Sequence, residues 1–103
     1  NIDQNTITTS GLMGGDCLAG IILGNDNASI TGNIIHGNAG SGLEIINNSS
    51  GNLISQNSFY ANGTAGPALG IDLNQDGVTL NDLGDGDNGP NNLLNFPIIW
   101  PQW

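Results

Sequence analysis

Residues 33–45, with the sequence NIIHGNAGSGLEI, contain the two short motifs that decide the fold. Asparagine followed two positions later by an apolar residue forms the first motif. Glycine followed by two apolar residues at alternate positions forms the second. The other copies are Asn5-Thr6-Ile7 and Asn57-Ser58-Phe59 for the first motif, and Gly20-Ile21-Ile22-Leu23 and Gly70-Ile71-Asp72-Leu73 for the second. The asparagine copies are 28 and 24 residues apart and the glycine copies 22 and 28. Two interleaved strand motifs at such a period predict a solenoid of stacked coils.

The apolar residues of each motif lie two positions apart, so they share one face of a strand. We expect this face to point into the solenoid and the intervening residues Ile22, Glu44 and Asp72 to form one outward column. Equivalent residues of stacked parallel strands lie ~4.8 Å apart, and asparagine side chains at that spacing can bond one another from coil to coil. The predicted internal ladder consists of Asn5, Asn33 and Asn57, and a second polar column consists of Ser10, Asn38 and Asn62.

The composition restricts the fold and the partners. The chain has 103 residues, with 17 glycines, 17 asparagines, no lysine or arginine, and a net charge of −9. Good helix formers are scarce, so almost no helix is expected. Nothing can neutralise phosphate, which excludes nucleic acid and anionic membranes as direct partners. An anionic polysaccharide could bind only through a bridging metal ion. Cys17 has no second cysteine to pair with, which excludes an intrachain disulfide.

The last strand motif continues into a distinctive closing segment. It contains GIDLNQDGVT at 70–79, ND at 81–82, GDGD at 84–87, GPN at 89–91 and NFP at 95–97. The motif rhythm resembles the right-handed parallel β-helix repeats of secreted bacterial proteins, and residues 70–97 resemble the segment that closes such helices in large bacterial surface proteins. The resemblance implies an all-β, right-handed parallel β-helix (β-solenoid) of about three coils with an irregular C-terminal tail. It also implies an extracellular or cell-surface location, but no reaction. We expect one domain, with the coils in residues 1–73 and an acidic loop and apolar closing tail in residues 74–103.

Five of the nine acidic residues lie between positions 72 and 87. The stretch DLNQDG at 72–77 matches the start of an EF-hand-like loop, but the twelfth position is Leu83 instead of an acid, so a true EF-hand is not expected. A less regular site with calcium as the cofactor is predicted, and a solvated acidic turn is the alternative. The predicted metal ligands are Asp76, Asp82, Asp85 and Asp87.

Glu44 and Asp72 are the candidates for a catalytic pair, because they occupy equivalent outward positions on neighbouring coils. A separation near ~5 Å would suit a retaining glycosidase. Aligned acids arise easily in a stacked repeat, however, and pectin-cleaving enzymes of this fold use arginine or lysine that this chain lacks. We therefore expect no enzymatic activity and assign no catalytic residue, and a carbohydrate-active enzyme is the third hypothesis.

The C-terminal tail is more apolar than a small core requires, which indicates a partner surface. The predicted self-association residues are Phe96, Ile98, Ile99, Trp100 and Trp103. The leading hypothesis is an extracellular structural subunit that joins head to tail into a filament or surface fibre, as a homopolymer. The alternative is a passive calcium- or glycan-binding surface or adhesion module excised from a larger protein, which a longer reading frame with more coils would favour.

Overall fold

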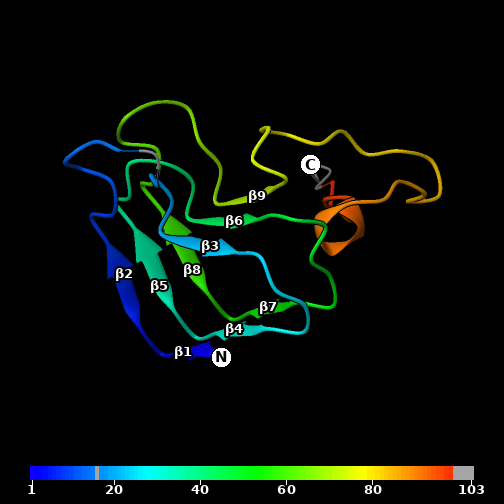
Figure 1. The fold of residues 1–103 in the computed structure, drawn as a ribbon, viewed down its shortest axis with the longest axis horizontal. Coiled ribbons are helices and arrows are strands. Elements are labelled where there is room, and N and C mark those ends of the chain that lie inside the picture. The colour runs from blue at the N-terminus through cyan, green and yellow to red at the C-terminus, as the bar shows by residue number, and fades with distance from the viewer. Residues whose placement is uncertain (16, 99–103) are drawn as a thin grey trace, which may run out of the picture.

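The chain winds into three coils, each of which contributes one short strand to each of three sheets (Figure 1). The computed structural model describes residues 1–15 and 17–98. The first coil contains β1 (Ile2–Asp3), β2 (Thr6–Thr8) and β3 (Ile21–Leu23). The second contains β4 (Ser29–Thr31), β5 (Ile34–His36) and β6 (Leu43–Ile45), and the third β7 (Leu53–Ser55), β8 (Ser58–Tyr60) and β9 (Ile71–Leu73). Within the described residues one 3-10 helix, η1 (Pro90–Leu93), follows the coils.

The sheets confirm the predicted parallel β-helix. Their strand orders are β1-β4-β7, β2-β5-β8 and β3-β6-β9, and every pair of neighbours is parallel. Ile7 pairs with Ile35 and Ile35 with Phe59, so residues of equivalent motifs stack directly above one another. The alternation of apolar and polar residues along each strand therefore gives the solenoid a continuous apolar interior.

The core is centred on the middle coil. Ile35, Leu43 and Ile45 are completely buried. Ile21 of the first coil is also buried. The other apolar residues of the first and third coils that pack against this core are only partly buried, because each of these coils has a neighbouring coil on one side only. These partly buried residues are Ile2, Ile7, Leu23, Ile54, Phe59 and Leu73.

Asparagines join the coils at the bend between the first and second strands. The backbone N–H of Asn5 donates to Oδ1 of Asn33 at 2.8 Å, and the backbone N–H of Asn33 donates to Oδ1 of Asn57 at 2.9 Å. The next bend repeats this arrangement, because the N–H of Ser10 donates to Oδ1 of Asn38. Each side chain thus supplies an acceptor to a backbone group that a bend leaves without a strand partner.

A residue in the left-handed region precedes each of these ladder positions. Before the asparagine ladder φ is 54° at Gln4, 65° at Gly32 and 58° at Gln56. Before the second column the corresponding residues are Thr9, Gly37 and Ala61. Glycine adopts this conformation without steric cost, whereas the other residue types are held in it by the coils above or below.

The glycines of the second motif are needed for a different reason, because atoms of neighbouring residues approach their backbone closely. A Cβ atom on Gly42 would lie 2.6 Å from Cδ1 of Phe59 and 2.9 Å from Nδ2 of Asn62. A Cβ on Gly20 would lie 2.7 Å from Nδ2 of Asn38. In the first two coils the motif therefore requires glycine, because amides of the second polar column lie against its backbone.

The closing segment returns to the solenoid at a third bend. The N–H of Ala28 donates to Oδ1 of Asn52, and the N–H of Asn52 donates to Oδ1 of Asn91 at 3.0 Å. The backbone N–H of Asn91 also donates to the carbonyl of Ser49. Asn91, at the start of η1, thus takes the same place at the end of the third coil that Asn52 has at the end of the second. The chain reaches this place only after a long excursion through residues 74–88.

Candidate functional site

The outward column of the third sheet carries the first group of acidic residues. Ile22 pairs with Glu44, and Glu44 with Asp72, as the sequence predicts. Asp72 nevertheless is only 7% exposed, because the turn at residues 74–77 folds back over it. Oδ2 of Asp72 accepts the N–H of Gly77 at 3.3 Å, and Oδ1 is buried with no hydrogen-bond partner among the described residues.

This burial changes the acidity of Asp72. Desolvation raises the pKa of the Asp72 carboxyl above its usual value of 3.8, and the neighbouring Asp76 carboxylate raises it further, while the N–H of Gly77 opposes the shift. The folded protein therefore binds the proton of Asp72 more tightly than a fully solvated carboxylate would.

Glu44, Asp72 and Asp76 line a groove of about 810 Å³ on the outside of the third sheet. Gln75, on the same turn, donates from Nε2 to Oε2 of Glu44 at 2.5 Å. The turn therefore binds both Glu44 and Asp72, the first through a side-chain amide and the second through a backbone N–H. With these contacts, both carboxylates serve to hold the turn against the sheet.

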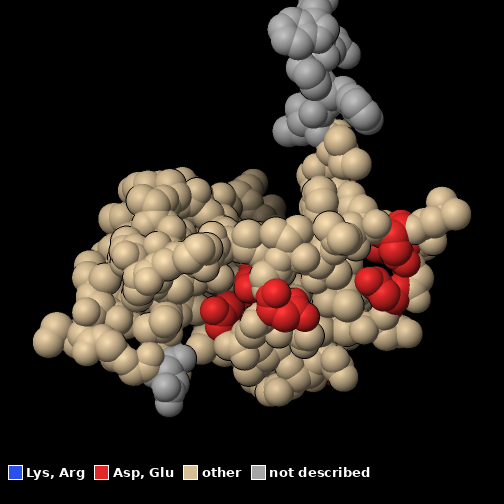
Figure 2. Space-filling model, turned by 90° about the horizontal axis from the view of Figure 1, so that it is seen from above, with Lys and Arg blue, Asp and Glu red and all other residues tan. Residues whose placement is uncertain are grey.

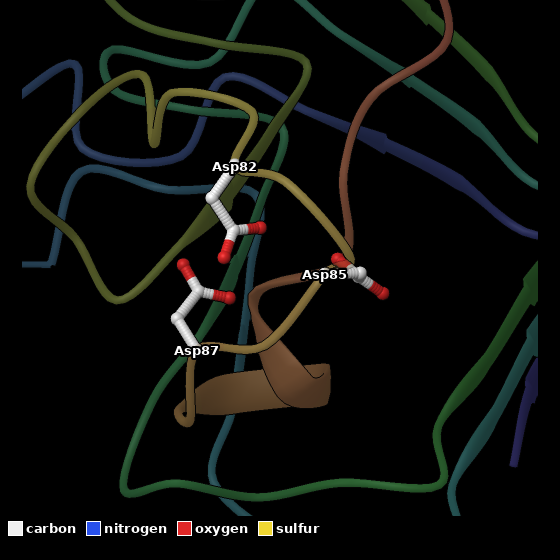
Figure 3. Close-up of side chains that lie close together, drawn as sticks. All are labelled: Asp82, Asp85 and Asp87. Carbon is white, nitrogen blue, oxygen red and sulfur yellow. The ribbon is translucent and has the colours of Figure 1, made fainter.

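The second group consists of Asp82, Asp85 and Asp87, on the excursion that follows β9. One oxygen from each lies within 4.8 Å of those of the other two. Figure 3 shows the carboxylates of Asp82 and Asp87 pointing toward one another, with Asp85 beside them. Oδ1 of Asp87 is buried without a hydrogen-bond partner among the described residues. Three carboxylates so arranged offer a hard cation its preferred ligands, although exposed acidic groups are common without one.

The structure thus separates the four predicted metal ligands. Asp76 lies beside Asp72 in the groove, and its Oδ2 accepts the side-chain amide of Asn74. It does not belong to the Asp82–Asp85–Asp87 triad. Figure 2 shows the acidic side chains in two separate areas of one face, as this division requires.

Asn81 and Asn95 of the closing segment hold the excursion in place. Oδ1 of Asn95 accepts the N–H of Asp82, and the N–H of Asn95 donates to Oδ1 of Asp85 at 2.9 Å. Asn81 and Phe96 exchange a second pair of hydrogen bonds. The carboxylate of Asp85 is therefore partly engaged within the protein. The repeat in the sequence gave no signal for these contacts, because Asn81 and Asn95 lie outside it.

The exposed face of the third coil is the other candidate site. Within the described residues no strand pairs with the outer edges of β7, β8 and β9. Ile71, Leu73, Val78, Leu94 and Phe96 line an apolar pocket of about 390 Å³ beside β9. Phe96 is 47% exposed and Ile98 is 62% exposed, while Ile99, Trp100 and Trp103, also predicted to self-associate, lie outside the described residues.

None of the described residues form a helix that is long and apolar enough to cross a membrane. No curated protein and no solved structure matches the chain. The family described as right handed beta helix region matches residues 1–89, which include all nine strands and the acidic triad. With three parallel sheets in register as well, the chain belongs to the right-handed β-helix family.

Proposed function

We propose that this chain is a structural subunit, located outside the cell or on its surface, that joins end to end with other copies into a filament. The observation that carries the proposal is the face of the third coil. β7, β8 and β9 each have a strand partner on one side only within the described residues, so a row of backbone groups remains available to another strand.

The asparagine ladder adds to this argument. In the first two coils, the backbone N–H at the bend donates to the asparagine of the next coil. The equivalent N–H of Asn57 has no acceptor among the described residues. A further coil with asparagine at the same position would supply that acceptor. The third coil thus has the chemistry of an internal coil with one neighbour missing.

The acidic groups favour a structural role over an enzymatic one. Glu44 and Asp72 bind the turn that covers them, so we propose no catalytic activity. The net charge of −9 would keep assembled fibres apart laterally and in solution. The extracellular location is also part of the proposal, supported by the resemblance of the closing segment to bacterial surface proteins.

Electron microscopy and light scattering of the purified chain test the proposal. We expect regular filaments whose mass increases with protein concentration. A matched sample of Asn5→Ala should assemble less well, because it removes the ladder asparagine at the other end of the stack and leaves the hydrogen bonds between Asn33 and Asn57 intact. A protein that stays monomeric at millimolar concentration, both in calcium and in a chelator, would contradict the proposal.

A calcium-binding surface module is the second candidate, and the triad of Asp82, Asp85 and Asp87 favours it. The buried, unpaired Oδ1 of Asp87 lies beside two further carboxylates, and a cation there would relieve their mutual repulsion. This candidate and the first are compatible, since calcium could stabilise the excursion in a filament. Isothermal titration with calcium decides whether the triad binds the ion.

A further inference from the structure

We infer that the partner of the third coil is the first coil of a second copy, docked in a single register that continues all three sheets. In this register Ile2 of the second copy lies over Ile54, Ile7 over Phe59 and Leu23 over Leu73. The inference rests on the proposed end-to-end assembly and specifies its geometry.

The register follows from the pairing of strands within one copy. Ile2 lies beside Ile30, and Ile30 beside Ile54. The other two sheets repeat this succession through Ile35 and Ile45. The apolar residues at both ends of these columns are only partly buried. Placing the first coil on the third would cover both sets at once and would extend each column with a residue of similar size and polarity.

The ladder continues in the same register. Asn5 of the second copy would lie over Asn57, where its Oδ1 could accept the backbone N–H that lacks an acceptor. Oδ1 of Asn5 is available for this, because no described residue within its own chain donates to it. A shift by one residue would bring Thr6 or Gln4 to this position and would turn the apolar face of each strand outward.

The charges at the interface between the two copies also agree with this register. Glu44 and Asp72 end the outward column of the third sheet, but the first residue of that column is Ile22. The interface therefore places an apolar side chain, and not a third carboxylate, over Asp72. On the first sheet Asp3 would lie over Ser55, where the serine hydroxyl could donate to it as Thr31 Oγ1 does within one copy at 2.8 Å.

The contact joins two different faces of the subunit, so it does not close on itself. Repetition produces a filament in which every copy adds three coils, or roughly 14 Å, along the axis. Each subunit in such a filament has all three of its coils paired on both sides.

Disulfide cross-linking tests the register directly. Thr8 of the second copy would lie over Tyr60, with Cα atoms ~5 Å apart, which suits a disulfide. Within one copy Thr8 and Tyr60 are separated by His36 in the same column, at ~10 Å, which is too far. The experiment combines Thr8→Cys and Tyr60→Cys in a Cys17→Ser background, oxidises the assembled protein and separates it on a non-reducing gel.

Two further pairs complete the design. Thr6→Cys with Ser58→Cys is also in register and leaves the stacked rings of His36 and Tyr60 intact. Thr6→Cys with Tyr60→Cys is the control, because it is out of register by two residues and its Cα atoms would be ~8 Å apart. We expect a ladder of covalent oligomers from both in-register pairs, and about tenfold less from the control.

The outcomes separate the inference from the proposed function. Filaments that fail to cross-link through the in-register pairs, or that cross-link equally through the control, would overturn the register and leave end-to-end assembly standing. If neither filaments nor covalent oligomers form at high concentration, both are wrong.

Discussion

Oδ1 of Asn57 accepts both the backbone N–H and the side-chain Nδ2–H of Asn33, each at 2.9 Å. Asn33 is 1% exposed, and its own Oδ1 accepts from Asn5 in the coil on its other side. Its side-chain amide also donates to the carbonyl of Ile2. One side chain therefore connects all three coils at a single bend, and its hydrogen bonds have no water to replace them.

Replacing Asn33 by alanine should accordingly destabilise the protein strongly. We expect Asn33→Ala to lower the free energy of unfolding by about 2–4 kcal/mol, because several buried polar groups lose their partners. Urea unfolding followed by circular dichroism measures the change. Asn25→Ala is the matched control, since Asn25 is exposed and the change should stay within about 0.5 kcal/mol. An equal loss of unfolding free energy in the two variants would contradict a specific contribution of the asparagine ladder to stability.

Ala61 offers a substitution in the opposite direction. It has φ of 51° in the bend where the middle coil has Gly37. Because a Cβ atom is unfavourable in the left-handed region, Ala61→Gly should stabilise the protein by about 1 kcal/mol, a gain that thermal unfolding would measure. Ala65→Gly, at an exposed position without a positive φ, should instead lower stability slightly. A loss of stability in Ala61→Gly would contradict the argument.

The buried carboxyl of Asp72 predicts a dependence of stability on pH. Its pKa in the folded protein is raised above 3.8, first by burial and then by Asp76. The folded state therefore binds the proton more tightly than the unfolded state does, and the resulting stability is fully present at low pH. It is lost as the pH rises through the folded-state pKa.

Urea unfolding at several values between about pH 4 and pH 7 measures this effect. Asp72→Asn should reduce the loss of stability across the range, because the amide carries no titrating proton. Asp85→Asn removes the same charge from the excursion and keeps an acceptor for the N–H of Asn95, so it should retain the dependence of the wild type on Asp72. Identical pH profiles for Asp72→Asn and the wild type would rule out the assigned origin.

Calcium should stabilise the excursion if the triad binds it. We expect calcium to raise the melting temperature, and Asp87→Asn to abolish the rise, since Asp87 contributes a buried oxygen beside two other carboxylates. Differential scanning calorimetry with calcium and with a chelator measures the difference. Asp76→Asn serves as the control, because Asp76 lies in the groove away from the triad. The same response in both variants would exclude the triad as the binding site.

The repeated residues make the coils predictable from the sequence, whereas the contacts of residues outside the repeat are not predictable from it. The motifs that contain Asn33 and Leu43 recur in every coil. Their recurrence specifies where the strands lie, which side chains point inward and how the strands pair. Asp76 could not be assigned to a group, because whether its turn folds back over Asp72 or continues outward depends on contacts with Glu44 and Gly77. The hydrogen bond of Asn91 to Asn52 has no signal in the repeat either, since Asn91 lies 39 residues after Asn52 and the motif copies are never separated by more than 28.

The bend between the first and second strands of each coil is always two residues long, at positions 4–5, 32–33 and 56–57. The connection between the second and third strands varies freely, from 37–42 in the middle coil to 9–20 in the first. Insertions and deletions during evolution should therefore accumulate in the variable connections, because a change at the two-residue bend would displace every side chain beyond it. For protein engineering, the same contrast marks the exposed residues 66–68, between Asn62 and Gly70, as a position for grafting a foreign peptide without disturbing the stack.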